Sequence, residues 1–137
     1  MATIDMQTMR YINLLRRIAN VNTMKCFIYN NMIIFAVPAN LVSKAVGPAG
    51  RNVRIIQERL GKKVKVIRDA DNIEEAGRFV GDIVSPVNFV SLEVRDNYVI
   101  LTAGIRNKAA LIGRNKKRLE ELRQIIEDNF GKELKIV

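Results

Sequence analysis

Residues 46–53, Val-Gly-Pro-Ala-Gly-Arg-Asn-Val, have the spacing of a loop that binds phosphate groups. Gly47 and Gly50 carry no side chain, so a sugar-phosphate backbone can approach the main chain closely at both positions. A helix is expected to begin at Arg51, with the N–H groups of Arg51 and Asn52 facing phosphate at the positive end of the helix dipole. The candidate binding residues here are Gly47, Pro48, Ala49, Gly50, Arg51, Asn52 and Arg54. A plain turn between two helices is the alternative interpretation of this spacing.

A second loop of related sequence has a lysine where the closing glycine is expected. Its candidate binding residues are Gly113, Arg114, Asn115, Lys116, Lys117 and Arg118. Lys116 is expected to prevent close backbone approach, so phosphate would be held there by side-chain charge. We therefore expect the second loop to bind more weakly than the first. The alternative is a degenerate copy that is kept for packing.

Composition removes several kinds of chemistry. The 137-residue chain has no histidine and a single cysteine, Cys26, which excludes histidine-based catalysis, His/Cys metal sites and disulfides within the chain. The acidic pairs Glu74-Glu75 and Glu120-Glu121 are expected on solvated helix surfaces. We therefore predict a protein that is not an enzyme and that has no catalytic residue, metal or cofactor. Cys26 is expected to pack as a small apolar residue in a reducing compartment.

Hydropathy predicts neither a secretory signal nor a membrane span. Three arginines, Arg10, Arg16 and Arg17, interrupt every apolar run near the start. The longest apolar run, residues 32–39, is too short to cross a bilayer. The expected location is the cytoplasm.

Basic residues are concentrated in the first half of the chain. Residues 1–70 hold twelve Lys and Arg against three acidic residues, a net charge of +9, whereas residues 71–137 hold eleven of each and are neutral. This asymmetry favours a polyanion as the partner of the first half, which we expect to carry more of the affinity. A basic surface that is merely solvated is the alternative.

Hydrophobic periodicity predicts a helix followed by a hairpin before the first loop. The helix is expected over residues 4–19, and its apolar face carries Tyr11, Leu14, Leu15 and Ile18. Residues 24–29 and 32–37 predict two strands. Asn30 and Asn31 between them tolerate positive φ, which is typical of a type I′ turn. The second strand is apolar throughout, so we expect it at the centre of the sheet with both faces at least partly covered.

Two helices and a strand are expected around and after the first loop. A short helix over residues 40–46 leads into the loop. The following helix is expected to bury Val53, Ile56 and Leu60 and to end at Gly61. Residues 63–67 predict a last strand, parallel to the central strand through a right-handed crossover.

The same order of elements is expected from residue 71 onward. A capping box from Asp71 to Glu74 opens a helix that ends at Ser85-Pro86. Its apolar face carries Ile73, Ala76, Val80, Ile83 and Val84. Val90, Leu92 and Val94 then alternate as a strand, and Asp96-Asn97 is expected to repeat the tight turn. A strand over 98–103 and a short helix over 107–112 follow.

A constant offset of 66 residues relates the two halves from the turn onward. The offset pairs Asn31 with Asn97, Ile34 with Ile100, Gly47 with Gly113 and Val53 with Leu119. At the end of the chain the offset becomes 70, because the second long helix has about one extra turn.

This order of elements resembles the type II KH module. Two modules in tandem, with the wording Val-Gly-Pro-Ala-Gly-Arg-Asn-Val and later Ile-Gly-Arg-Asn, resemble the KH pair of the NusA family of transcription factors. The resemblance implies an α+β fold with two tandem type II KH domains, residues 1–70 and 71–137. Each is expected to have a three-stranded mixed sheet covered on one face by three helices.

The resemblance also implies a function. We expect a monomeric factor in transcription elongation and termination that binds single-stranded RNA of the nascent transcript, has RNA polymerase as a further partner and has no membrane partner. Each KH groove would hold about four nucleotides, with Val46 and Val53 as candidates for an apolar groove wall. The alternative function is a KH protein of ribosome maturation or of another RNA assembly.

Overall fold

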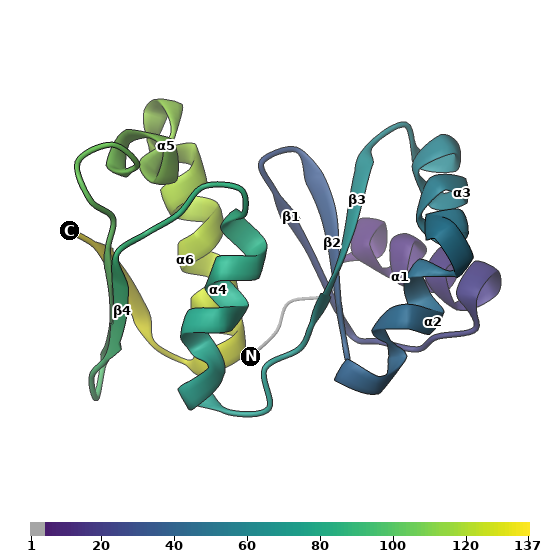
Figure 1. The fold of residues 1–137 in the computed structure, drawn as a ribbon, viewed down its shortest axis with the longest axis horizontal. Coiled ribbons are helices and arrows are strands. Elements are labelled where there is room, and N and C mark those ends of the chain that lie inside the picture. The colour runs from purple at the N-terminus through teal and green to yellow at the C-terminus, as the bar shows by residue number, and fades with distance from the viewer. Residues whose placement is uncertain (1–4) are drawn as a thin grey trace. The chain divides into compact units, whose positions relative to one another are not determined.

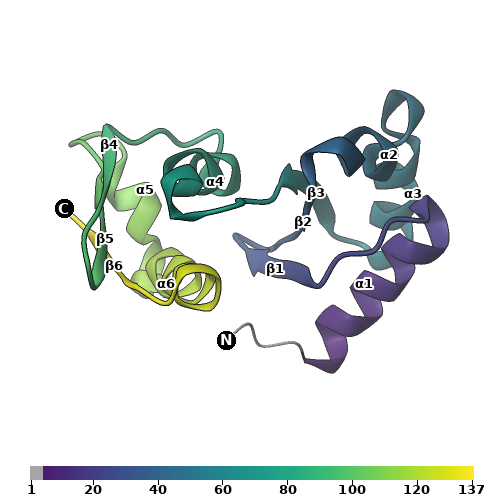
Figure 2. The same cartoon turned by 90° about the horizontal axis from the view of Figure 1, so that it is seen from below.

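The computed structural model describes residues 5–137, so Ile4 of the first predicted helix lies outside the described residues. The described residues divide into two compact units, with the boundary between Asp69 and Ala70. Each unit as described combines α-helices with one three-stranded mixed sheet, so the fold class is α+β. Figures 1 and 2 show that the α-helices of each unit lie on one side of its strands.

The first unit follows the order that the sequence predicts. Its elements are α1 (Met6–Ala19), β1 (Lys25–Tyr29), β2 (Met32–Val37), α2 (Val42–Val46), α3 (Arg51–Leu60) and β3 (Lys63–Arg68). Short 3₁₀ turns, Ala39–Leu41 and Pro48–Gly50, precede α2 and α3. The central strand β2 is antiparallel to β1 and parallel to β3, which confirms the predicted sheet.

Local sequence sets the ends of these elements. Asp5 caps α1 by accepting a hydrogen bond of 2.7 Å from the Thr8 backbone N–H, and the hydrogen bonds from Thr8 lower the pKa of the Asp5 carboxyl. Asn30 and Asn31 have φ of 50° and 60°, which confirms positive φ at both turn positions. Gly61 ends α3 in the left-handed region, as predicted.

The core of the first unit lies between the sheet and the helices. Leu15 of α1, Ala45 of α2 and Ile56 of α3 are completely buried against Ile33 and Phe35 of β2. Three alternate residues of β2, Ile33, Phe35 and Val37, are buried in this core, so the helices cover one face of the central strand. The other two predicted core residues of α3, Val53 and Leu60, are only partly buried.

Cys26 packs against the same core, as its apolar character predicts. Burial raises the pKa of its thiol to about 12, because a charged thiolate is poorly stabilised away from water. The thiol therefore stays protonated and unreactive at neutral pH.

The second unit repeats the order of the first. Its elements are α4 (Ala76–Val84), β4 (Ser91–Val94), β5 (Tyr98–Thr102), α5 (Lys108–Ile112), α6 (Lys117–Phe130) and β6 (Glu133–Ile136). β5 is central, antiparallel to β4 and parallel to β6. α6 has 14 residues and α3 has 10, so the predicted extra helical turn is present.

The core of the second unit includes one residue of α4 that the sequence analysis did not place on the apolar face. Phe79 is completely buried and meets the ring of Phe130 edge to face, with ring centroids 5.7 Å apart. Four of the predicted residues are also buried: Ala76, Val80, Ile83 and Val84. Ile73 is only partly buried, because it lies in the 3₁₀ turn that precedes α4.

The predicted capping box is displaced by one residue. Asn72, not Asp71, is the capping residue, and its Oδ1 accepts a hydrogen bond of 2.9 Å from the Glu74 N–H. Glu75, not Glu74, reaches back to accept the Asp71 N–H at 2.6 Å. The displacement occurs because the helical segment opens with a 3₁₀ turn, Ile73–Glu75.

The second hairpin differs from the first. Asp96 and Asn97 connect β4 to β5 as predicted, with the Arg95 N–H donating to the Tyr98 carbonyl oxygen at 2.7 Å across them. Neither residue has positive φ, so the backbone geometry of the first turn is not repeated. The ammonium group of Lys132 donates hydrogen bonds to the carbonyl oxygens of Arg95 and Asp96, which holds this turn in another conformation. Val90, predicted in the strand, precedes β4 and is 72% exposed.

The capping assignment can be tested by two single substitutions. Asn72→Ala should lower the free energy of unfolding by about 1 kcal/mol, because it leaves an N–H at the start of the helix unpaired. Asp71→Ala should change it by less than about 0.5 kcal/mol, because that side chain is exposed. Urea unfolding curves measure both, and a larger loss for Asp71→Ala would contradict the assignment.

Candidate nucleic-acid interface

The two glycine loops have the same backbone conformation. Gly47 has φ 81° and ψ 166°, and Gly113 has φ 76° and ψ 168°. The third positions agree as well, with φ and ψ of 52° and 30° at Ala49 and of 56° and 29° at Asn115. The sequence difference between the loops therefore does not change the course of the main chain.

Matching hydrogen bonds hold both loops. The Gly50 N–H donates to the Gly47 carbonyl oxygen at 3.0 Å, and the Lys116 N–H donates to the Gly113 carbonyl oxygen at 3.1 Å. Each opening glycine is also tied to the short helix before it, by a bond of 2.9 Å from its N–H to Ser43 or to Ala109. Each loop is therefore tied at its start and at its end.

The opening glycine is required by the next helix. A Cβ atom on Gly47 would lie 2.8 Å from the Asn52 side chain, and a Cβ atom on Gly113 would lie 2.6 Å from the Arg118 side chain. Both glycines also have a backbone conformation that other residues rarely adopt. Packing within the unit therefore explains Gly47 and Gly113 without any ligand.

The closing position faces open space. A Cβ atom on Gly50 would meet no atom within 4 Å, so only its φ of 73° favours glycine there. Lys116 takes the same conformation, with φ 59° and ψ 23°. The main chain of the second loop therefore follows the same course as that of the first. Only the side chain of Lys116 can prevent close approach of a ligand to the backbone there.

The Arg51 N–H is not available to a ligand in the way the sequence suggests. It donates within the loop to the Pro48 carbonyl oxygen, as the Lys117 N–H does to that of Arg114. No side chain caps either helix N-terminus. An anion at these loops is therefore attracted by the helix dipole and by the basic side chains.

The side chains of the first loop divide into two kinds. The Arg54 guanidinium donates a hydrogen bond of 2.8 Å to the Ala49 carbonyl oxygen, which places its charge beside the loop. Asn52 donates to the Lys44 carbonyl oxygen at 3.1 Å and so ties α3 to the end of α2. Arg51 and Pro48 are exposed. Asn52 thus has a structural contact, while Arg51 and Arg54 supply charge at the surface.

The second loop presents more exposed charge. Arg114, Lys116 and Lys117 are all exposed. Arg118, the remaining candidate of this loop, is partly buried and pairs with Glu121 at 3.2 Å. Glu120 lies on an exposed helix surface, as predicted, and pairs with Arg123 at 2.8 Å. By the offset of 66 residues it occupies the position of Arg54, so the second loop has an acidic residue where the first has a basic one.

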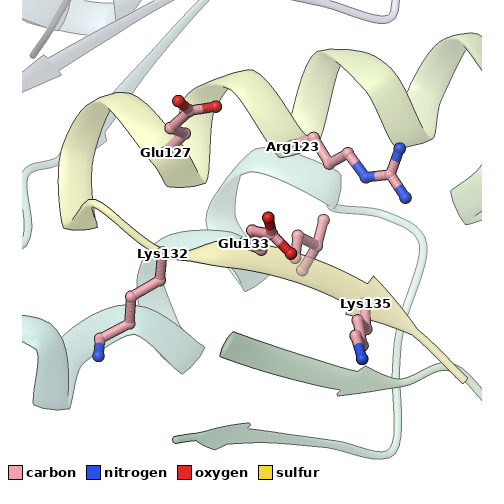
Figure 3. A pocket seen from close by; sticks show the side chains of 6 residues that line it. Arg123, Glu127, Lys132, Glu133 and Lys135 are labelled. Carbon is pink, nitrogen blue, oxygen red and sulfur yellow. The ribbon is translucent and has the colours of Figure 1, made fainter. Parts of the chain in front are cut away.

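The two residues predicted to form an apolar groove wall are only partly available at the surface. Val53 packs against the core of the first unit, and Val46 is partly exposed. Hollows in the surface of the second unit lie elsewhere, along α6 and β6 (Figure 3). Side chains of both signs line the hollow in that view, among them Arg123, Glu127 and Lys132. Such mixed charge is a poor match for a polyanion.

The described residues offer neither a metal site nor a helix that could span a membrane. In residues 5–137 no three His, Cys, Asp or Glu side chains lie close enough together to hold a metal ion. Over the same residues, no helix combines the length and the apolar composition that crossing a membrane requires.

Three curated proteins that share one name are similar to this chain over most of its length. No family model matches the chain. A protein of Halococcus morrhuae named probable transcription termination protein NusA is 25% identical over 131 residues, which cover 93% of this chain and 92% of that protein. The proteins of the same name from Methanocaldococcus jannaschii and Methanococcus vannielii are 27% and 24% identical over 120 and 131 residues. These matches cover 85% and 92% of this chain, and 64% and 74% of those proteins.

The chain resembles the archaeal NusA proteins. A solved structure titled "Crystal structure of APE1850" shares the fold, with a TM-score of 0.68 and 28% identity over 98% of this chain and 99% of that one. The resemblance to NusA thus extends over most of the chain and is not confined to the glycine loops.

The two closing positions predict opposite effects on stability. Lys116→Gly should raise the free energy of unfolding by about 0.5–1 kcal/mol, because glycine adopts positive φ without the strain of a side chain. Gly50→Ala should lower it by a similar amount. Gly47→Ala should lower it by more than about 2 kcal/mol, because a clash adds to the strain. Equal losses at Gly47 and Gly50, measured by urea unfolding, would contradict this distinction.

Proposed function

We propose that this protein is a NusA-like transcription factor that binds single-stranded RNA through two tandem type II KH domains, residues 1–70 and 71–137. The observation that carries the proposal is the pair of glycine loops with matching backbone, each opening into a helix with exposed basic residues. The resemblance to proteins named transcription termination protein NusA supports the role in transcription.

Binding would begin with phosphate groups at the glycine loops. The open space beside Gly50 admits a sugar-phosphate backbone, and two arginines, Arg51 and Arg54, follow Gly50 in the sequence. The Arg54 guanidinium lies beside the loop, because it donates a hydrogen bond to the Ala49 carbonyl oxygen. The dipole of α3 adds to the attraction. At the second loop, Arg114, Lys116 and Lys117 would hold phosphate by side-chain charge.

The protein would act by binding and not by catalysis. Aromatic residues make up only 6% of the chain, so stacking of bases on rings is not the main mode of contact. Affinity would instead come from phosphate contacts and from short apolar grooves, a mode that tolerates many RNA sequences. The RNA would be the nascent transcript, and RNA polymerase would be the second partner.

The first loop provides the direct test of this function. Replacing Pro48 and Ala49 with Asp places two carboxylates where phosphate would lie, so the affinity for single-stranded RNA should fall at least tenfold, or about 1.4 kcal/mol. The fold should tolerate the change, because both residues are exposed and the polar Asn115 adopts the conformation of Ala49. Fluorescence anisotropy measures the affinity, and the melting temperature reports the fold.

The second loop supplies the matched control. Pro48→Arg with Ala49→Asn copies Arg114 and Asn115 into the first loop, and this variant should bind RNA at least as tightly as the original chain. Wild-type affinity of the doubly acidic variant, with its fold intact, would show that the Gly47 loop is only a connection between helices.

A further inference from the structure

The outward face of α1 is basic and unpaired. Arg10, Arg16 and Arg17 are exposed, and α1 contains no acidic residue. Among the residues that the structure describes, none of these three side chains makes a hydrogen bond or an ion pair. Arg10 and Arg17 are seven residues apart, which places them on the same side of the helix, opposite the buried Leu15.

This basic surface continues onto α3. The two helices pack against each other, and α3 adds Arg51, Arg54 and Arg59, all of them exposed. Glu58 is the only acidic residue in the two helices, against six arginines. We call the exposed arginines of α1 and α3 the arginine face. Because α3 begins at the first glycine loop, the arginine face is continuous with that loop.

The corresponding helices of the second unit are organised differently. Two helical segments correspond to α1 and α3: α4 together with the 3₁₀ turn before it, and α6. Together they contain four basic and seven acidic residues. Three of the four basic side chains form ion pairs within the unit: Arg78 with Glu75 and Asp82, Arg118 with Glu121, and Arg123 with Glu120. The repeat of the fold therefore does not explain the arginine face.

Most of the arginine face does not stabilise the fold. Like charges on neighbouring helix positions repel each other, so the unpaired arginines of α1 weaken the unit slightly. Arg54 of α3 differs, because its guanidinium donates a hydrogen bond to the Ala49 carbonyl oxygen. Guanidinium groups bind phosphate oxygens through paired N–H donors, and a row of them matches the repeated charge of a phosphate backbone. The two exposed apolar side chains of α1, Met6 and Met9, lie in its first two turns. Beyond those turns the exposed face of α1 is charged and not apolar.

We propose that the arginine face binds the sugar-phosphate backbone of RNA that extends beyond the segment held at the Gly47 loop. This proposal rests on the proposed function and adds a second contact surface to it. The bound RNA would be longer than the roughly four nucleotides of one KH groove, and the added affinity would be independent of base sequence.

The test compares two lengths of single-stranded RNA on the full chain. Arg10→Glu with Arg17→Glu should weaken binding of an RNA of about twelve nucleotides fivefold or more at low salt. The same variant should bind an RNA of about four nucleotides, followed by NMR titration, as tightly as the original chain. For the longer RNA, the slope of log affinity against log salt should become less negative by about 1.4, or 0.7 for each lost phosphate contact.

A matched variant controls for net charge. Arg95→Glu with Lys135→Glu changes the net charge from +9 to +5, as the test variant does, at two exposed positions of the second unit. This control should bind both RNAs as the original chain does. Melting temperatures establish that both variants are folded.

Two outcomes would overturn the proposal. Wild-type affinity of the Arg10 and Arg17 variant for the longer RNA would mean that the arginine face serves another partner, such as an acidic protein. An equal loss in the control variant would mean that only net charge matters. Neither result bears on the proposed function of RNA binding at the Gly47 loop. That function would be contradicted only if the variant with Asp at positions 48 and 49 kept its affinity for the short RNA.

Discussion

The first turn of α3 lies so close to Gly47 that no side chain fits between them, and the first turn of α6 lies equally close to Gly113. This close approach fixes where each long helix begins and which way it leaves the loop. It also holds the short helix before the loop, because Asn52 reaches back to the carbonyl oxygen of Lys44. The exposed positions of the loop, Pro48 and Ala49, are thereby presented at a defined place on the surface.

The same constraint separates the structural glycine from the glycine that leaves room for a ligand. Gly47 is explained by packing alone, whereas the space beside Gly50 is empty. Lys116 keeps the backbone of that closing position and places a charged side chain in its surroundings. The two units thus present the same loop with different chemistry: open main chain in the first, and side-chain charge in the second.

Much of this architecture could be predicted from the sequence, because it depends on local signals. The positive φ of Asn30 and Asn31, the end of α3 at Gly61 and the central place of β2 all follow from residue type and hydrophobic period. The capping residue was missed because two overlapping patterns fit a capping box. Asp71 is followed three residues later by Glu74, and Asn72 by Glu75; only the 3₁₀ turn decides between them.

Other features depend on contacts between elements. The bond from Lys132 that reshapes the second hairpin joins residues 36 and 37 positions apart, so no local pattern predicts it. The role of Asn52 as a tie between helices likewise needs the position of Lys44. The pairing of Arg118 with Glu121 was within reach of the sequence, because residues three apart on a helix are neighbours. Sequence spacing therefore located the candidate site, but not the division of its side chains between packing and surface charge.

If RNA is held at the two glycine loops, NMR titration of the isotopically labelled chain with single-stranded RNA will reveal it. The largest changes in amide chemical shift should then occur at residues 47–51 and 113–117. Changes confined to other surfaces, such as the hollow between α6 and β6, would contradict it.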